Sequence, residues 1–126
     1  MKPRLVIADD EADIRRLITF LLRTYDLSEA QNGAQALKLV REVQPDLVLL
    51  DIMMPEMTGL EVASHLHADP ATAAIPIIFL SAKGQAAEIE QGLQSGGTRY
   101  LVKPFTPDEL RRCVTEVLQE YPRSSS

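Results

Sequence analysis

The sequence predicts an α/β fold in which five strands and five helices alternate along a single domain. Short apolar runs recur along the chain, and segments with helical spacing separate them. The clearest runs, at 47–50 and 77–80, are apolar at every position. Continuous apolar runs of this length are typical of parallel strands that are covered by helices on both faces. The predicted architecture is therefore a doubly wound parallel sheet.

The predicted strands differ in the strength of their patterns. The first ends before Asp9, and the second has the weakest pattern and is short. The third ends at Asp51, and Pro76 opens the fourth, where a missing N–H is tolerated at a strand's first position. In chain order we expect strands at 5–8, 27–30, 47–50, 77–80 and 100–102.

The predicted helices are bounded by ordinary start and stop signals. Pro45 stops the second helix, and Pro107 falls in the first turn of the fifth. Gly96 and Gly97 provide a stop signal after the fourth. In chain order we expect helices at 12–22, 34–43, 59–67, 85–95 and 107–119. We assign residues 1–121 to one domain and expect 122–126 to form a disordered tail.

Composition and charge exclude several classes of protein. The chain of 126 residues has 13 Lys and Arg against 18 Asp and Glu, a formal net charge of −5. Direct nucleic-acid binding is disfavoured because it requires a basic surface. Cys113 is the single cysteine, which allows no internal disulfide and fits a reducing compartment. Neither a signal peptide nor a membrane-spanning run is present, so we expect a cytoplasmic protein without membrane contact.

Polar residues follow the ends of four predicted strands. Asp9 and Asp10 follow the first strand, and Asp51 ends the third. Ser81 follows the fourth strand, and Lys103 follows the fifth. Ligands of doubly wound sheets bind outside the carboxyl ends of the strands, so we expect these side chains to share one site. Each also has an ordinary explanation, because acids cap helices, small polar residues form turns and lysines usually lie in solvent.

The acidic residues at these strand ends favour a bound divalent cation. Three carboxylates at one edge of a sheet repel one another, and a single lysine offsets only part of their charge. Ligation by carboxylate and water oxygens suits Mg²⁺. The group contains no His or Cys, which argues against zinc. His65 and His67 are two positions apart on a predicted helix, so they do not share a face, and we expect both to be exposed.

Four short motifs resemble those of a known family. They are ADDE at 8–11, LLDIMMPEMTGLE at 49–61, LSA at 80–82 and YLVKPF at 100–105. In this order and spacing, the chain resembles the receiver domains of bacterial two-component response regulators from residue 5 to about residue 118. The resemblance implies the flavodoxin-like strand order 2-1-3-4-5. It also implies a cis bond between Lys103 and Pro104 and the function of a phosphorylation-dependent signalling switch.

The resemblance implies how the phosphoryl group and the metal are held. Asp51 would accept a phosphoryl group from a sensor histidine kinase or a phosphotransfer protein. Asp10, Asp51 and the backbone carbonyl of Met53 would bind Mg²⁺ directly. Asp9 would act mainly through a bound water. A carboxylate is a competent nucleophile toward an activated phosphoryl donor, and the metal would supply positioning and charge neutralisation.

The resemblance also assigns residues to recognition, relay and hydrolysis. Ser81 would hydrogen-bond the phosphoryl group, and Lys103 would contact it as a positive charge. Tyr100 would change rotamer on activation. A downstream partner or output domain would bind the face formed by the fourth helix, the fifth strand and the fifth helix. Met53 and Lys83 would flank the phosphoryl group and tune its hydrolysis.

Two other classes of protein fit the sequence less well. A Mg²⁺-dependent phosphotransferase of the haloacid dehalogenase type needs a second aspartate two residues after its nucleophile, where this chain has Met53. A flavodoxin-like electron carrier needs a Ser-, Thr- and Gly-rich loop after its first strand, where residues 9–11 are acidic and would repel the phosphate of FMN. We therefore expect no enzymatic turnover of outside substrates. Glu11 is expected to begin the first helix.

Overall fold

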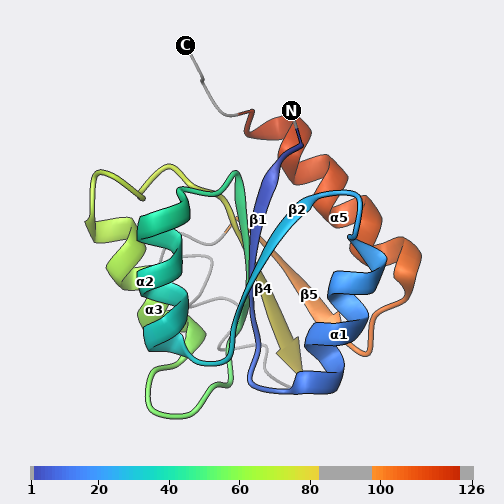
Figure 1. The fold of residues 1–126 in the computed structure, drawn as a ribbon, viewed down its shortest axis with the longest axis horizontal. Helices are drawn as coiled ribbons and strands as arrows, with labels where there is room; N and C mark the ends of the chain where they lie inside the picture. The colour runs from blue at the N-terminus through green and yellow to red at the C-terminus, as the bar shows by residue number, and fades with distance from the viewer. Residues whose placement is uncertain (1, 83–97, 123–126) are drawn as a thin grey trace.

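The computed structural model describes residues 2–82 and 98–122 and shows strands alternating with helices (Figure 1). Every observed element begins and ends within two residues of the predicted one. The predicted helix at 85–95 and residues 123–126 of the predicted tail lie outside the described residues. The elements are β1 Arg4–Ala8, α1 Ala12–Leu21, β2 Asp26–Ala30, α2 Gly33–Val43, β3 Leu47–Asp51, α3 Gly59–Ala68, β4 Ile77–Ala82, β5 Arg99–Lys103 and α5 Pro107–Glu120.

The strands form one five-stranded sheet in the order β2-β1-β3-β4-β5, and all neighbouring strands are parallel. The predicted fold class and strand order are therefore confirmed. The register pairs Asp51 with Leu80, and Lys103 with Ala82. The carboxyl ends of β3, β4 and β5 consequently lie side by side, at the lower edge of the sheet in Figure 1.

Helices cover both faces of the sheet, with α1 and α5 on one side and α2 and α3 on the other (Figure 1). Successive side chains of a strand point to opposite faces, so each central strand contributes to two cores. Under α2 and α3 lie Val6, Ala8, Val48 and Leu50, and under α1 and α5 lie Leu5, Ile7, Leu47 and Leu49. This double burial explains the continuous apolar runs and leaves the strand ends as the places for polar side chains.

Side-chain caps fix where α2, α3 and α5 begin, and at α2 the Asn32 side chain accepts the N–H of Gln35. Thr58 and Glu61 form a capping box at the start of α3, and Thr106 and Glu109 form one at the start of α5. The start of α1 is different, because its N-cap residue, Glu11, makes no capping hydrogen bond with its side chain. The prediction that Glu11 begins the helix is confirmed, and its carboxylate has a partner elsewhere.

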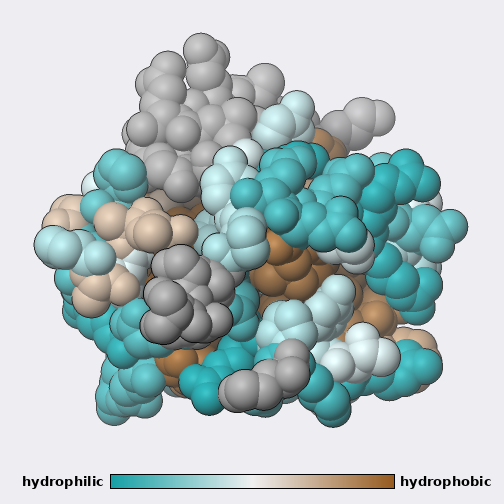
Figure 2. Space-filling view, turned by 90° about the horizontal axis from the view of Figure 1, so that it is seen from above, coloured by the Kyte–Doolittle hydropathy of each residue, from teal (hydrophilic) through white to brown (hydrophobic). Residues whose placement is uncertain are grey.

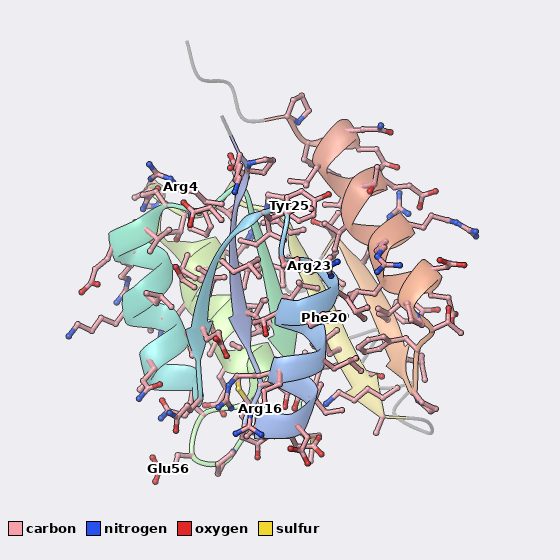
Figure 3. The ribbon with its side chains drawn as sticks, turned by 45° about the vertical axis from the view of Figure 1, so that its right-hand side comes forward. Arg4, Arg16, Phe20, Arg23, Tyr25 and Glu56 are labelled. Carbon is pink, nitrogen blue, oxygen red and sulfur yellow. The ribbon has the colours of Figure 1, made fainter. Side chains whose placement is uncertain are left out.

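The loop between β3 and α3 contains a strained residue. Glu56 has a φ of 69°, in the left-handed region that a residue with a Cβ adopts at a cost of roughly 1–2 kcal/mol. Its side chain lies at the outer edge of the loop and points into solvent (Figure 3). Replacing it therefore removes no packing.

Glu56→Gly should raise the free energy of unfolding by about 0.5–1 kcal/mol in urea titrations. The relief of strain exceeds the extra freedom that glycine gives the unfolded chain, which offsets roughly 0.5–1 kcal/mol. The matched control is Glu42→Gly in the exposed part of α2, which should lower stability by about 1 kcal/mol. A loss of stability in Glu56→Gly as large as that in the control would show that the loop carries no strain.

The end of the molecule at which β1 begins and α5 ends is largely hydrophilic. Figure 2 looks onto this end and shows a mostly hydrophilic surface, with hydrophobic areas near its middle and a paler one at the left rim. Among residues 2–82 and 98–122, no helix has the length and apolar character needed to cross a membrane. The polar groups at the strand ends lie at the opposite end of the sheet.

Candidate functional site

The candidate site centres on the ammonium group of Lys103, at the carboxyl end of β5. Its Nζ donates to Asp9 Oδ2 at 2.9 Å, to Glu11 Oε1 at 3.2 Å and to Asp51 Oδ2 at 3.4 Å. Asp9 follows β1 and Asp51 ends β3, so three strands and the start of α1 contribute to one group of charges. The sequence alone allowed Lys103 to be an ordinary solvated lysine. In the structure its side chain is only 16% exposed.

Four carboxylates gather at this edge of the sheet. One oxygen each from Asp9, Asp10, Glu11 and Asp51 lies within 4.8 Å of the others, a spacing that could hold a metal ion. Asp9 is fully buried, and Asp51 is 4% exposed. Asp10 and Glu11 are exposed at the rim. The structure therefore brings together the three aspartates that were expected at one site, Asp9, Asp10 and Asp51. It adds Glu11 to them.

Local hydrogen bonds hold Asp9 in place. Its Oδ1 accepts the N–H of Glu11 at 2.9 Å, and its own N–H donates to the carbonyl of Ala30 on β2 at 3.2 Å. The guanidinium of Arg15 on α1 donates to the Asp9 carbonyl at 2.6 Å. Both carboxylate oxygens of Asp9 are thus engaged, one by Glu11 and the other by Lys103. A fully bonded, buried carboxylate has little freedom to reorient toward a ligand.

Asp51 is held from two sides. The N–H of Met53 donates to Asp51 Oδ1 at 3.2 Å, while Oδ2 faces Lys103. The start of α3 packs against its backbone, and the Gly59 N–H donates to the Ile52 carbonyl at 2.9 Å. A Cβ on Gly59 would lie 2.2 Å from the Asp51 carbonyl oxygen, closer than any side chain can approach. Glycine at this position therefore allows α3 to begin directly beside the site.

The electrostatics of the site leave the carboxylates only partly compensated. Burial and the charge of Asp9 raise the pKa of Asp51 to about 7, although Lys103 and the Met53 N–H act in the opposite direction. Burial would lower the pKa of Lys103, but its hydrogen bond with Asp9 and the charges of Asp51 and Asp9 raise it overall. Lys103 thus stays charged, and its single positive charge leaves the carboxylates of the site with a net negative charge that a cation could balance.

The remaining predicted site residues lie around this cluster. Ser81 is buried at the end of β4, and its hydroxyl donates to the Ala82 carbonyl at 3.2 Å. Tyr100 on β5 is 46% exposed. Met53, two residues after Asp51, is 57% exposed. Lys83 lies outside the described residues. The Lys103–Pro104 peptide bond is cis, as the resemblance implied.

One ordinary explanation from the sequence, that an aspartate caps α1, is wrong for this site. Neither Asp9 nor Asp10 is the N-cap of α1, because that position belongs to Glu11. Glu11 in turn contacts Lys103, which lies 92 positions away in the sequence. The only local sign of this contact was an acid directly after an acidic pair, which equally fits the first turn of a helix. His65 and His67 are exposed on α3, as expected.

Comparison with known proteins agrees with this architecture. The family model for the response regulator receiver domain matches residues 5–115. The DNA-binding response regulator MtrA of Mycobacterium tuberculosis is 42% identical over 112 residues, covering 87% of this chain and 48% of that protein. The phosphate regulon transcriptional regulatory protein PhoB of Pseudomonas aeruginosa is 43% identical over 117 residues, covering 91% and 51% respectively. The chain spans about half the length of these relatives.

Two solved receiver structures are similar over nearly their whole length. The chemotaxis response regulator CheY4 of Vibrio cholerae has a TM-score of 0.88 at 28% identity, covering 94% of this chain and 100% of that one. The signal receiver domain of a signal transduction histidine kinase from Syntrophus aciditrophicus has a TM-score of 0.88 at 25% identity, covering 98% and 96%. With the sheet order, the acidic cluster and the family match in agreement, this chain belongs to the response regulator receiver domain family.

Proposed function

We propose that this chain accepts a phosphoryl group on Asp51 from a sensor histidine kinase or a phosphotransfer protein, with Mg²⁺, and relays the signal by a conformational change. The family is one of signalling domains rather than true enzymes, and a receiver domain implies a histidine kinase partner. One observation supports the proposal most strongly. The carboxylates of Asp9, Asp10 and Asp51 and the ammonium of Lys103 converge at the carboxyl end of the sheet.

The acidic cluster fits Mg²⁺ by its chemistry. Every candidate ligand atom is a carboxylate oxygen, and the raised pKa of Asp51 is what desolvated neighbouring acids show when a single lysine is their counter-ion. Within the described part of the chain, the exposed Asp10 carboxylate accepts no hydrogen bond, unlike that of Asp9. This difference supports direct ligation by Asp10 and Asp51, with the Met53 carbonyl, and an indirect role for Asp9. Mg²⁺ would supply charge neutralisation for the transferring phosphoryl group.

The chain's own groups would position and receive the phosphoryl group. An Asp51 oxygen forms a bond to phosphorus while the bond from phosphorus to the donor's imidazole nitrogen breaks, and that imidazole keeps the electron pair. Lys103 lies 3.4 Å from Asp51 Oδ2, close enough to reach the phosphoryl oxygens. The Ser81 hydroxyl is buried one strand away and would give up its bond to Ala82 to donate to the phosphoryl group.

The experiment that tests this function is the intact mass of the protein after incubation with acetyl phosphate. With Mg²⁺ the protein should gain the mass of one phosphoryl group. The same incubation with a chelator should give no gain. An unchanged mass at saturating Mg²⁺ and donor, in protein shown to be folded, would contradict the proposal.

The relay would use Tyr100 and the face around β5. Tyr100 is 46% exposed and its neighbour Val102 is 37% exposed, so this strand presents apolar surface to solvent. When Ser81 moves toward the phosphoryl group, Tyr100 would turn inward and change that surface, which is a shift between two packings. A downstream partner or an output domain would bind there. The two named relatives are a DNA-binding and a transcriptional regulator, so an output step in transcription is part of the proposal.

Met53 should make the phosphorylated form long-lived. Its side chain is 57% exposed beside Asp51, and a thioether is too weak an acceptor to orient a hydrolytic water. Met53→Asn places an amide there that can position this water, so loss of phosphate should accelerate by roughly tenfold or more. Lys83 lies outside the described residues, and Met53→Asn/Lys83→Glu should accelerate the loss further.

Decay of the phosphorylated mass after removal of the donor measures this effect. Met57→Asn, at a partly buried methionine of the same loop, is the control for a general change in the loop. Unchanged or slower decay in both Met53 variants would show that this position does not govern hydrolysis.

A further inference from the structure

Lys103 has as many hydrogen-bond acceptors as it has protons to donate. Its ammonium group carries three donors, and the acceptors are one oxygen each of Asp9, Glu11 and Asp51. A phosphoryl group on Asp51 brings additional acceptor oxygens to the same ammonium. Lys103 can contact that group fully only if one of its present partners is released.

The three partners differ in how easily they can be released. The Asp9 side chain is fully buried, so without Lys103 it would be a buried charge without a counter-ion, which is strongly unfavourable. Asp51 carries the phosphoryl group and stays beside the lysine. The Glu11 side chain is 61% exposed, so its carboxylate is rehydrated as soon as it leaves Lys103.

Glu11 is also placed so that its side chain can leave without disturbing the backbone. Its side chain makes no capping bond to α1, while its N–H stays bound to Asp9 Oδ1 at 2.9 Å. Moving the carboxylate into solvent therefore changes neither the start of the helix nor the position of Asp9. The contact of Glu11 with Lys103 joins the start of α1 to the end of β5. It therefore also holds the Lys103 side chain in the position that it has without a phosphoryl group.

We infer that Glu11 is the exchangeable partner of Lys103 and occupies, in the unphosphorylated protein, the ammonium donor that the phosphoryl group takes over. The inference rests on the proposed function of Asp51. Glu11 competes with the phosphoryl group for the lysine, so it is a positioning residue that disfavours the phosphorylated state. Removing its charge should therefore make the site bind a phosphoryl group, or a mimic of one, more tightly.

The test is the affinity of the full chain for beryllofluoride at saturating Mg²⁺, followed by NMR. Glu11→Gln keeps the size of the side chain and should bind beryllofluoride about two- to fivefold more tightly than the wild type, the range expected for a solvent-exposed ion pair. Asp13→Asn is the matched control, because it makes the same change in net charge on α1. Asp13 faces solvent and pairs with Arg16 at 3.9 Å, away from Lys103.

A second readout follows the lysine itself. The ¹³Cε signal of Lys103 should differ between the wild type and Glu11→Gln in the free protein, and this difference should collapse when both hold beryllofluoride. Equal Lys103 signals in the two free proteins, or a gain in affinity no larger than that of Asp13→Asn, would overturn the inference while leaving the proposed function intact. Failure of the wild type to bind beryllofluoride at all would instead contradict the proposed function.

Discussion

Asp51→Asn should take up no phosphoryl group from acetyl phosphate under conditions in which the wild type gains one. An amide lacks the negative charge and the available lone pair that make a carboxylate a nucleophile toward phosphorus. The substitution preserves the local structure, because the amide oxygen can still accept the Met53 N–H that Asp51 Oδ1 accepts at 3.2 Å. The expected effect is complete loss of the mass increase.

The matched control for this experiment is Asp108→Asn, an exposed acid in the first turn of α5. It makes the same chemical change at an exposed side chain that pairs with Arg111 and is not part of the acidic cluster, so it should be phosphorylated like the wild type. Circular dichroism and urea unfolding would establish that both variants are folded. Labelling of Asp51→Asn to the extent seen in the control would show that the acceptor has been assigned to the wrong residue.

Removal of Asp10 should weaken Mg²⁺ binding more than removal of Asp9. Asp10 has an exposed carboxylate that accepts no hydrogen bond among the described residues, whereas both oxygens of Asp9 are bonded, to Glu11 and Lys103. Substituting a residue that supports a metal site without binding the metal directly typically lowers the protein's affinity for the metal by roughly 10–100-fold. We expect Asp9→Asn to fall near the lower end of that range and Asp10→Asn to reach or exceed its upper end.

Isothermal titration or NMR shifts with increasing Mg²⁺ would measure both affinities. Asp13→Asn, which removes an exposed acid of α1, controls for the change in net charge and should leave Mg²⁺ affinity nearly unchanged. Equal losses in the Asp9 and Asp10 variants would mean that the direct and indirect roles are wrongly assigned.

The sequence was sufficient for the sheet because burial determines its pattern. Strands β3 and β4 are covered on both faces, so nearly every position is apolar and their positions can be read directly. Strand β2 is harder to read, since it lies at the edge of the sheet and its residues 26–29 are at least partly exposed. Its pattern was therefore weak, although the structure shows a regular five-residue strand there.

Site residues could be predicted where a polar side chain ends or follows a strand of the sheet. The contact of Glu11 with Lys103 was missed because the sequence offered a local role for this residue. Asp9, Asp51 and Lys103 end or follow strands of one parallel sheet, so their convergence follows from the topology. Glu11 begins α1 as its N-cap, and only the fold shows that its side chain also reaches Lys103. The exposure of Asp10 relative to Asp9 likewise depends on packing by α1 and β2, which adjacent positions in a sequence do not reveal.

The central claim is that Asp51 is the residue that carries the phosphoryl group. The most direct measurement is to phosphorylate the wild-type protein with acetyl phosphate and Mg²⁺, reduce the acyl phosphate with borohydride, and locate the reduced residue by peptide mass spectrometry. Reduction converts a phosphorylated aspartate to homoserine and leaves free carboxylates unchanged. We predict homoserine at position 51 alone. Homoserine at Asp9, Asp10 or any other acid, with position 51 unmodified, would contradict this account of the site.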